Sequence, residues 1–370
     1  MARINSVLFV LDMFGFFGGP ERRAFRLAKG LKNAGLEISI VSIMKPEERM
    51  VKKSQRYGIK FYPLTQEGNK ALKSFRVDVF FKLRKLINFI NPDALFTFEF
   101  LADYTTKMAT YGQNRNIYTF IGSTVWKWER KWHRKVFMEH FVKRSKLYIA
   151  NSESVKRNVI RVLPQAKSKV AVLYNPIDTD EFRPFSKEEK ESIRRKFGFN
   201  SDELLIGSVV RFYNPKGADV LIEAFAKSGL DAKLLLVGDG SQKEQLIKLA
   251  KKLNISEKVI FMGTLEATSE IYNIFDVCVV PSQKGGFDNV VIEAMACGIP
   301  TVATKATGIG EIAKSGKDLV ITEIDAVSIS NGINSILKDL TQFSRNGRQF
   351  VLKKLAIEKI TESLLELIDG

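Results

Sequence analysis

The feature that most constrains the fold of this chain is the alternation of short apolar runs with segments of helical spacing. An apolar run at Ser6–Leu11 precedes residues 20–33, where small and aliphatic residues recur every three or four positions, and a second run follows at residues 37–43. Short apolar strands that alternate with helices are typical of a parallel sheet covered on both faces. Later in this half we expect strands at residues 93–97, 117–120 and 146–150, and helices at residues 70–90 and 127–146.

The second half of the chain repeats this alternation, which predicts a second domain of the same kind. Strands are expected at residues 204–210, Lys233–Val237, 259–262, Val277–Val280, 301–303 and 318–321, with helices at residues 218–226, 242–253, 268–274 and 290–296. A stretch near residues 175–187 that contains Pro176 and Pro184 is the predicted linker. The expected fold is α/β: two doubly wound Rossmann-like domains facing a cleft. They comprise residues 1–180 and 181–349, and a C-terminal helix at about residues 350–370 is expected to return to the first domain.

Cysteine and histidine are too rare to build a disulfide framework or a zinc site. Cys278 and Cys297 both lie in apolar runs, so we expect two reduced core thiols in a cytoplasmic protein. His133 and His140 have no partner at metal-ligand spacing. The first apolar run is closed by Asp12, which favours a strand over a signal peptide. No apolar stretch reaches the roughly 18 residues that a membrane span requires.

The excess positive charge of the chain is confined to its first half. Residues 1–180 contain 33 Lys and Arg against 15 Asp and Glu, whereas residues 181–370 contain 25 and 26. Residues 75–89 and 126–137 mix aromatic with cationic side chains, and the second stretch includes all three tryptophans. Such stretches suit an anionic membrane surface, with the protein held peripherally on the inner face; they also suit a helix with one core face and one solvated face. Nucleic acid is not expected as a partner, because no recognition motif accompanies the charge.

A loop between an apolar strand and a helix carries two cations. Arg211 follows the strand at residues 204–210, and Lys216 and Gly217 open the next helix. A forked guanidinium, a compact ammonium and a helix N-terminus together suit a diphosphate. Taken by itself, the same pattern also fits a solvated basic loop.

A second loop of this kind is rich in glycine. Gly285 and Gly286 would let the backbone approach a ligand closely. Asn289 and Val290 follow at the start of a helix, where backbone N–H groups have no partner within the helix. Glu293 lies one turn later on an otherwise apolar helix, where a carboxylate is costly without a partner. The hydroxyl pair of a ribose is the partner that we expect.

With these loops, the chain resembles the GT-B family of retaining glycosyltransferases (group 1, or family 4), which includes sucrose-phosphate, mannosyl and lipopolysaccharide-core transferases. Each matching motif is weak alone, but seven occur in the order of the family and span the chain. They are Gly18-Gly-Pro-Glu-Arg22, Asn175-Pro-Ile-Asp-Thr-Asp-Glu-Phe-Arg-Pro184, Arg211 with Lys216-Gly217, Val237-Gly-Asp-Gly240, Asp276 with Pro281-Ser282, Glu293-Ala-Met-Ala-Cys-Gly298 and Gly308-Ile-Gly-Glu311.

The resemblance implies a nucleotide-sugar site that needs no metal and no other cofactor, because side-chain cations stabilise the leaving group. Arg211 and Lys216 are implied to bind the donor diphosphate, and Glu293 to hold the ribose, as the catalytic set. Gly18 and Gly19 are implied to lie near the donor phosphates and the acceptor, and Met262 and Gly263 near the base. The remaining implied donor contacts come from Gly285, Gly286, Phe287, Asn289 and Val290.

The chain departs from the family pattern at two positions that would face the transferred sugar. The family usually has a glutamate where Gly285 stands and often a histidine where Ile121 stands. A shifted alignment within residues 283–288 or an inactive variant would explain the first departure. Glu99 or Asp103 is a candidate replacement, and Ser123 is a further candidate on the acceptor side.

Two hypotheses of function follow from this pattern. The first is a retaining glycosyltransferase that moves a hexose from a UDP- or GDP-sugar to a lipid-linked or saccharide acceptor in cell-surface glycan synthesis. The second is a catalytically degenerate subunit that binds a nucleotide sugar within a glycosyltransferase complex. Ile121 and Gly285 are the residues that keep the second hypothesis open.

Overall fold

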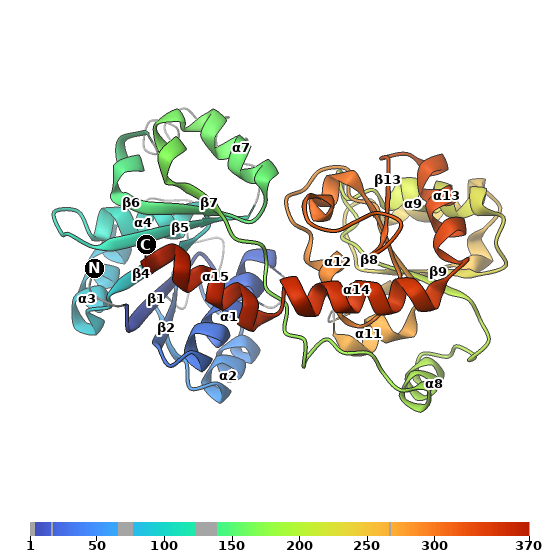
Figure 1. The fold of residues 1–370 in the computed structure, drawn as a ribbon, viewed down its shortest axis with the longest axis horizontal. Helices are drawn as coiled ribbons and strands as arrows, with labels where there is room; N and C mark the ends of the chain where they lie inside the picture. Colours follow the sequence, from blue (N-terminus) through green and yellow to red (C-terminus); the bar gives the residue numbers. More distant parts are fainter. Residues whose placement is uncertain (1–3, 16–17, 66–76, 123–138, 266–267, 370) are drawn as a thin grey trace. The chain divides into compact units, whose positions relative to one another are not determined.

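The structure is a computed structural model that describes residues 4–15, 18–65, 77–122, 139–265 and 268–369 (Figure 1). The chain divides into two compact units. Unit 1 comprises residues 1–176 and 357–370, and unit 2 comprises residues 177–356. Each unit is built on its own parallel sheet, which confirms the predicted α/β class with two Rossmann-like domains.

The described part of unit 1 forms a seven-stranded sheet in the order β3-β2-β1-β4-β5-β6-β7, with all pairs parallel. The strand order reverses between β1 and β4, the place where ligands bind in doubly wound sheets. The strands are β1 (Ser6–Leu11), β2 (Glu37–Ser42), β3 (Lys60–Pro63), β4 (Ala94–Phe98), β5 (Asn116–Ile121), β6 (Ser145–Ala150) and β7 (Val170–Val172). The helices are α1 (Gly19–Asn33), α2 (Glu48–Arg56), α3 (Val77–Ile90), α4 (Phe100–Ala109), α7 (Glu153–Val162) and α15 (Ile357–Asp369).

The last helix, α15, is an integral part of unit 1. It lies so close to α1 that a Cβ atom on Gly30 would come within 2.0 Å of the Thr361 hydroxyl and 2.7 Å of Ile357. At its other end, the Tyr118 hydroxyl donates a 3.2 Å hydrogen bond to the carbonyl of Ile368. A residue as small as glycine on α1 is therefore required for the two helices to meet.

In the described part of unit 2, a six-stranded parallel sheet has the order β10-β9-β8-β11-β12-β13, which reverses between β8 and β11. The strands are β8 (Leu205–Val209), β9 (Lys233–Val237), β10 (Val259–Gly263), β11 (Val277–Val280), β12 (Thr301–Thr304) and β13 (Val320–Thr322). The helices are α8 (Lys187–Lys196), α9 (Ala218–Ser228), α10 (Lys243–Lys252), α11 (Ser269–Ile274), α12 (Asn289–Ala296), α13 (Ala326–Ile336) and α14 (Leu340–Lys354). The apolar residues of β8, β9 and β11 form its core with α9 and α13.

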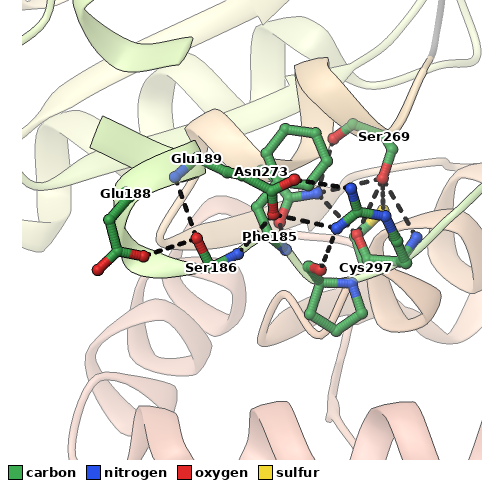
Figure 2. A network of polar contacts seen from close by, with 9 residues as sticks. Phe185, Ser186, Glu188, Glu189, Ser269, Asn273 and Cys297 are labelled. Atoms are coloured by element: carbon green, nitrogen blue, oxygen red, sulfur yellow. Dashed lines mark hydrogen bonds and ion pairs between the residues drawn. The ribbon is translucent and has the colours of Figure 1, made fainter. Parts of the chain in front are cut away.

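A polar network fastens the start of unit 2 to α11 and α12 (Figure 2). The Ser269 hydroxyl donates to the carbonyl of Arg183 at 2.9 Å and lies 3.5 Å from the Cys297 sulfur. The side chain of Asn273 accepts a 2.9 Å bond from the Phe185 amide. Ser186 then begins α8 with a capping box. The linker predicted near residues 175–187 is therefore hydrogen-bonded to unit 2 over much of its length.

The structure corrects several sequence-based boundaries. The chain passes into unit 2 after Pro176, not after residue 180. The single helix expected at residues 350–370 is two helices, of which α14 belongs to unit 2 and α15 to unit 1. The helix expected to reach residue 146 ends earlier, because a 3₁₀ turn at Val142–Arg144 leads directly into β6. Its residues 127–138, like residues 70–76 of the helix expected before β4, lie outside the described residues.

Both cysteines are buried and free, and burial raises the pKa of the Cys278 thiol well above its usual range and that of Cys297 to about 12. They are therefore inert core thiols rather than reactive groups. Within the part of the chain that the structure describes, no helix is both long and apolar enough to span a bilayer.

Candidate functional site

The site predicted in the second half gathers at the carboxyl edge of the unit 2 sheet, where β8 and β11 lie side by side. The loop after β8 and the loop after β11 are hydrogen-bonded to each other, because the Gln283 amide donates to the Pro215 carbonyl at 2.9 Å. A Cβ atom on Gly217 would lie 2.1 Å from the Pro281 carbonyl oxygen, and Gly217 has φ of 77°. Only glycine allows this contact and this backbone conformation together. The two loops therefore form one surface at the strand-order reversal.

Arg211 lies on this edge with its side chain exposed to solvent. Its guanidinium carbon is 5.1 Å from the centre of the Tyr213 ring, so the aromatic face orients the cation. The next residue is hydrogen-bonded to the loop that follows β9, because the Phe212 amide donates to the Asp239 carbonyl at 2.9 Å. A Cβ atom on Gly240 would lie 2.3 Å from the Phe212 carbonyl oxygen. The Gly238–Gly240 motif thus supports the segment that carries Arg211.

Lys216 connects the two loops through an ion pair. Its Nζ lies 3.2 Å from Oδ1 of Asp288, and the side chains are 22% and 17% exposed. This partner was not predicted from the sequence. The ammonium is therefore already positioned over the start of α12.

The glycine-rich loop after β11 packs tightly against the segment that follows β12. The Asp288 amide donates to the Thr307 carbonyl at 3.2 Å. Gly308 has φ of 70°, and a Cβ atom there would lie 2.4 Å from the Gly286 carbonyl oxygen. A Cβ on Gly285 would lie 3.3 Å from the Ala306 carbonyl oxygen. The loop conformation therefore depends on glycines in both segments.

Helix α12 begins directly behind this loop. Asp288 is its N-cap residue, but its side chain makes no capping hydrogen bond. Phe287 is buried and anchors the loop, and Asn289 is 7% exposed. Val290 follows within the first turn, where amide groups have no intrahelical acceptor. Backbone donors and the positive end of the helix dipole are thus presented toward Lys216.

Glu293 is completely buried, and its structural partner is a protein group. The Tyr272 hydroxyl on α11 donates a 2.7 Å hydrogen bond to Oε2 of Glu293. A neighbouring helix thus supplies one hydrogen bond to this carboxylate, and the contact of Glu293 with a ribose stays a prediction. Tyr272 precedes Glu293 by 21 residues, and no local spacing rule would have paired them.

Met262 and Gly263 end β10, two strands away from β8. Gly263 has φ of 72°, and its carbonyl accepts a 2.8 Å bond from the Gly238 amide. These residues share the carboxyl edge of the sheet with the cation-bearing loop.

In unit 1, the carboxyl ends of β1 and β4 gather acidic side chains. Oδ1 of Asp12 accepts a 2.5 Å bond from the Ala102 amide. Burial, reinforced by Glu99, raises the pKa of Asp12 well above its usual range. Burial likewise raises the pKa of Glu21 to about 7, with Glu99 adding to the rise. Glu99 itself has φ of 73°, a strained conformation for this residue type.

The glycines predicted at the start of α1 lie beside this acidic group. Gly18 is the N-cap residue and Gly19 the first residue of the helix. A Cβ on Gly18 would overlap the Glu21 carboxylate at 1.6 Å, so the glycine lets that side chain fold back over the helix start.

Asp103 is not available for the acceptor contact that the sequence suggested. It is 3% exposed and forms a 2.7 Å ion pair with Lys107, which is 1% exposed. Its Oδ1 accepts from the hydroxyls of Thr97 and Thr119 at 3.0 and 2.7 Å. Asp103 is therefore held in a buried structural ion pair and does not face an acceptor.

Of the remaining predicted positions, Ile121 ends β5 and is 3% exposed, whereas Ser123 lies outside the described residues. In the described ranges, no group of three or more His, Cys, Asp or Glu side chains is arranged to hold a metal ion.

Comparison with known proteins gives the class of this protein. The family model for glycosyl transferases group 1 matches residues 189–350, and the model for glycosyltransferase family 4 matches residues 17–181. The two models together match most of the chain, and the fold agrees with them. The chain therefore belongs to the family 4-like glycosyltransferases of GT-B fold.

Individual relatives are distant. N-acetyl-alpha-D-glucosaminyl L-malate synthase of Bacillus anthracis is 30% identical over 210 residues, which are 55% of this chain and 54% of that protein. The chain thus aligns with about half the length of such curated relatives. Among solved structures, Anabaena HepE in complex with UDP has a TM-score of 0.83 at 19% identity, covering 98% of this chain and 99% of that one. Sucrose-phosphate synthase of Thermosynechococcus elongatus has a TM-score of 0.80 at 19% identity, covering 98% of each chain.

Proposed function

We propose that this protein is a retaining glycosyltransferase that moves a hexose from a UDP- or GDP-sugar to a lipid-linked or saccharide acceptor in cell-surface glycan synthesis. The observation that carries the proposal is the meeting of Arg211, Lys216 and the start of α12 at the edge between β8 and β11. Structures similar to this chain hold UDP or UDP-glucose, and its relatives include an N-acetyl-alpha-D-glucosaminyl L-malate synthase and a D-inositol 3-phosphate glycosyltransferase.

The chemistry of the transfer explains why cations are needed at this edge. The bond between the anomeric carbon and the diphosphate oxygen breaks, and the departing diphosphate gains negative charge. Arg211 can bind it as a fork and Lys216 as a point charge, while amides of the first turn of α12 donate hydrogen bonds. These groups are sufficient for leaving-group stabilisation, so we propose that transfer requires no metal and no other cofactor.

The decisive test is a thermal-shift panel of UDP, GDP and ADP, each with and without an attached hexose, followed by hydrolysis and transfer assays in the presence of EDTA. We expect one nucleotide to raise the melting temperature and one nucleotide sugar to be turned over despite the chelator. Arg211→Ala should lose the shift. A protein that binds none of these ligands and turns over none of the sugars would contradict the proposal.

A second candidate function is favoured by Gly285, which leaves the loop without the side chain that the family places toward the sugar. A non-catalytic subunit would bind the nucleotide sugar without turning it over, and turnover would appear only when a partner protein is added. Turnover by the purified chain alone decides against this candidate.

We also propose that unit 1 contacts an anionic membrane through α3. Val79, Leu83 and Ile87 face the core, whereas Phe81 and Phe89 are 68% and 80% exposed. Lys85, between these two aromatic residues, is exposed as well. An exposed Phe–Lys–Phe stripe at four-residue spacing can insert its rings among lipids while its cation meets the headgroups. The similarly patterned residues 126–137 lie outside the described residues.

Sedimentation with vesicles tests this contact. The protein should bind vesicles of phosphatidylcholine with phosphatidylglycerol but not of phosphatidylcholine alone, since each cation near anionic lipid contributes about 1 kcal/mol. Replacement of Phe81 and Phe89 by serine should reduce binding and leave nucleotide binding intact. Equal sedimentation of the variant and the wild type would argue against α3 as the contact.

A further inference from the structure

The fold does not explain the environment of the Asp288 side chain. It occupies the N-cap position of α12, where an aspartate ordinarily accepts a hydrogen bond from an amide of the first turn. Here the side chain makes no such bond. Oδ1 accepts from Lys216 instead, and Oδ2 is buried without a hydrogen-bond partner among the described residues.

A buried carboxylate oxygen without a donor is unfavourable, and such atoms are rare in folded proteins unless a water or a ligand satisfies them. The capping bond is the obvious way to satisfy this one, since the amides lie within the next turn. The Asp288 backbone amide donates to the Thr307 carbonyl at 3.2 Å, while the side chain pairs with Lys216 and does not cap the helix.

This buried, unpartnered oxygen lies beside the position that Gly285 leaves without a side chain. A Cβ atom built on Gly285 would lie 3.5 Å from Oδ2 of Asp288. The same Cβ would lie 3.3 Å from the Ala306 carbonyl oxygen. The carboxylate is therefore next to the point where residue 285 would otherwise present its own side chain.

We propose that Oδ2 of Asp288 accepts a hydrogen bond from a hydroxyl group of the donor sugar, while Oδ1 positions the Lys216 ammonium for the diphosphate. This inference deepens the proposed function and rests on it. Phosphate oxygens would be repelled by the carboxylate, so its partner must be a donor. The sugar is bonded directly to the diphosphate that Lys216 contacts, and its hydroxyls are the first donors beyond the phosphates.

With Asp288 in this role, Gly285→Glu, which would restore the family pattern, should not improve binding of the nucleotide sugar. A glutamate at position 285 would place a second carboxylate beside Asp288, and like charges at this separation repel. Its Cβ would also crowd the Ala306 carbonyl. Gly285→Glu alone should therefore weaken binding of the nucleotide sugar, whereas Gly285→Glu combined with Asp288→Gly should recover part of it.

The experiment compares UDP with UDP-glucose, and GDP with GDP-mannose, by calorimetric titration of the full chain. The nucleotide that binds is then tested with deoxy analogues of its sugar, each lacking one hydroxyl. For the wild type, loss of one particular hydroxyl should weaken binding about ten- to hundredfold, the range for a hydrogen bond to a charged acceptor. In Asp288→Ala that same deletion should have no further effect. Affinity for the nucleotide alone should fall less than affinity for the nucleotide sugar, because only the sugar loses a hydrogen-bond acceptor.

Two comparisons keep the outcomes distinct. Asp288→Asn, which preserves shape, replaces Asp288→Ala if the latter is unfolded by its melting curve. Glu203→Gln serves as the matched control, because Glu203 is the partly buried ion-pair partner of Lys233 at the amino end of the strands. It should leave the affinities for nucleotide and nucleotide sugar unchanged. If Asp288→Ala still distinguishes the same analogue, or weakens nucleotide and nucleotide sugar equally, the inference is overturned while the proposed function stands. If the wild type binds no nucleotide, both are overturned.

Discussion

The buried ion pair between Lys107 and Asp103 gives a sharp prediction about stability. Both side chains are almost completely buried, and Nζ lies 2.7 Å from Oδ2. The Tyr148 hydroxyl accepts a second bond from Nζ at 3.3 Å. Lys107→Met keeps the length of the side chain but leaves the carboxylate without its cation. Removal of one partner from such a pair costs about 3–5 kcal/mol, because the remaining charge is buried and uncompensated.

The expected loss can be measured as a shift in thermal unfolding. For a unit of this size, 1 kcal/mol corresponds to about 2–4 °C, so Lys107→Met should lower the melting temperature of unit 1 by roughly 6–20 °C. The double variant Lys107→Met with Asp103→Leu should recover much of the loss, since no charge then remains buried. A single variant within about 1 kcal/mol of the wild type, or a double variant no more stable than the single one, would refute the reasoning.

The pKa of Lys107 also predicts how the stability difference between the wild type and Lys107→Met changes with pH. Burial alone would lower the pKa of Lys107, but Asp103 and Tyr148 outweigh it, and the pKa is raised above 10.5. A raised lysine pKa contributes stability that is complete below the unfolded pKa and is lost as the pH rises through the folded one. The stability gap between wild type and Lys107→Met should therefore be constant at neutral pH and narrow only in strong alkali.

Three further predictions concern single contacts. Tyr272→Phe removes the hydrogen bond to the fully buried carboxylate of Glu293 on α12. It should lower the free energy of unfolding in urea by about 1–3 kcal/mol and weaken nucleotide binding measured by calorimetry. An unchanged unfolding midpoint would show that this bond does not stabilise the fold. Glu21 has a folded pKa of about 7 against 4.5 unfolded, so it stabilises the fold below pH 4.5 and loses that contribution as the pH rises through 7, by at most about 3 kcal/mol. Glu21→Gln should flatten the stability–pH curve over this interval, and a slope equal to that of the wild type would exclude Glu21 as its source. Gly308→Ala would place a Cβ 2.4 Å from a backbone carbonyl oxygen and should abolish the thermal shift with nucleotide. Gly316 has a similar φ of 77° but no atom near its Cβ position. Gly316→Ala should therefore lower the free energy of unfolding by only about 1–2 kcal/mol and keep the thermal shift.

Much of the fold was accessible from the sequence because buried parallel strands are continuously apolar. β1 and β9 coincide with the predicted strands, and α1 begins within one residue of its predicted start. Elements with weaker patterns were missed: β3 is partly exposed, and the strand β7 has three residues.

The contacts that define the site could not be predicted from the sequence, because they join residues that are far apart along the chain. Lys216 and Asp288 are 72 residues apart, and their pairing follows from the adjacency of β8 and β11 in the sheet. The pairing of Tyr272 with Glu293 likewise depends on where α11 lies against α12. By contrast, Asp103 and Lys107 are four residues apart on α4, so this pair was visible in the sequence as a helical i,i+4 spacing. What the sequence could not indicate is that the pair is buried.

The position of α15 in unit 1 has a consequence for the order in which the protein can be assembled on the ribosome. Every residue of unit 2 is synthesised before α15, so the carboxyl-terminal unit in sequence can complete its core while the first unit still lacks a helix. Until α15 arrives, the face of α1 around Gly30 is uncovered and Tyr118 lacks its acceptor. In sequence order, unit 2 is therefore complete before the last helix of unit 1 is made.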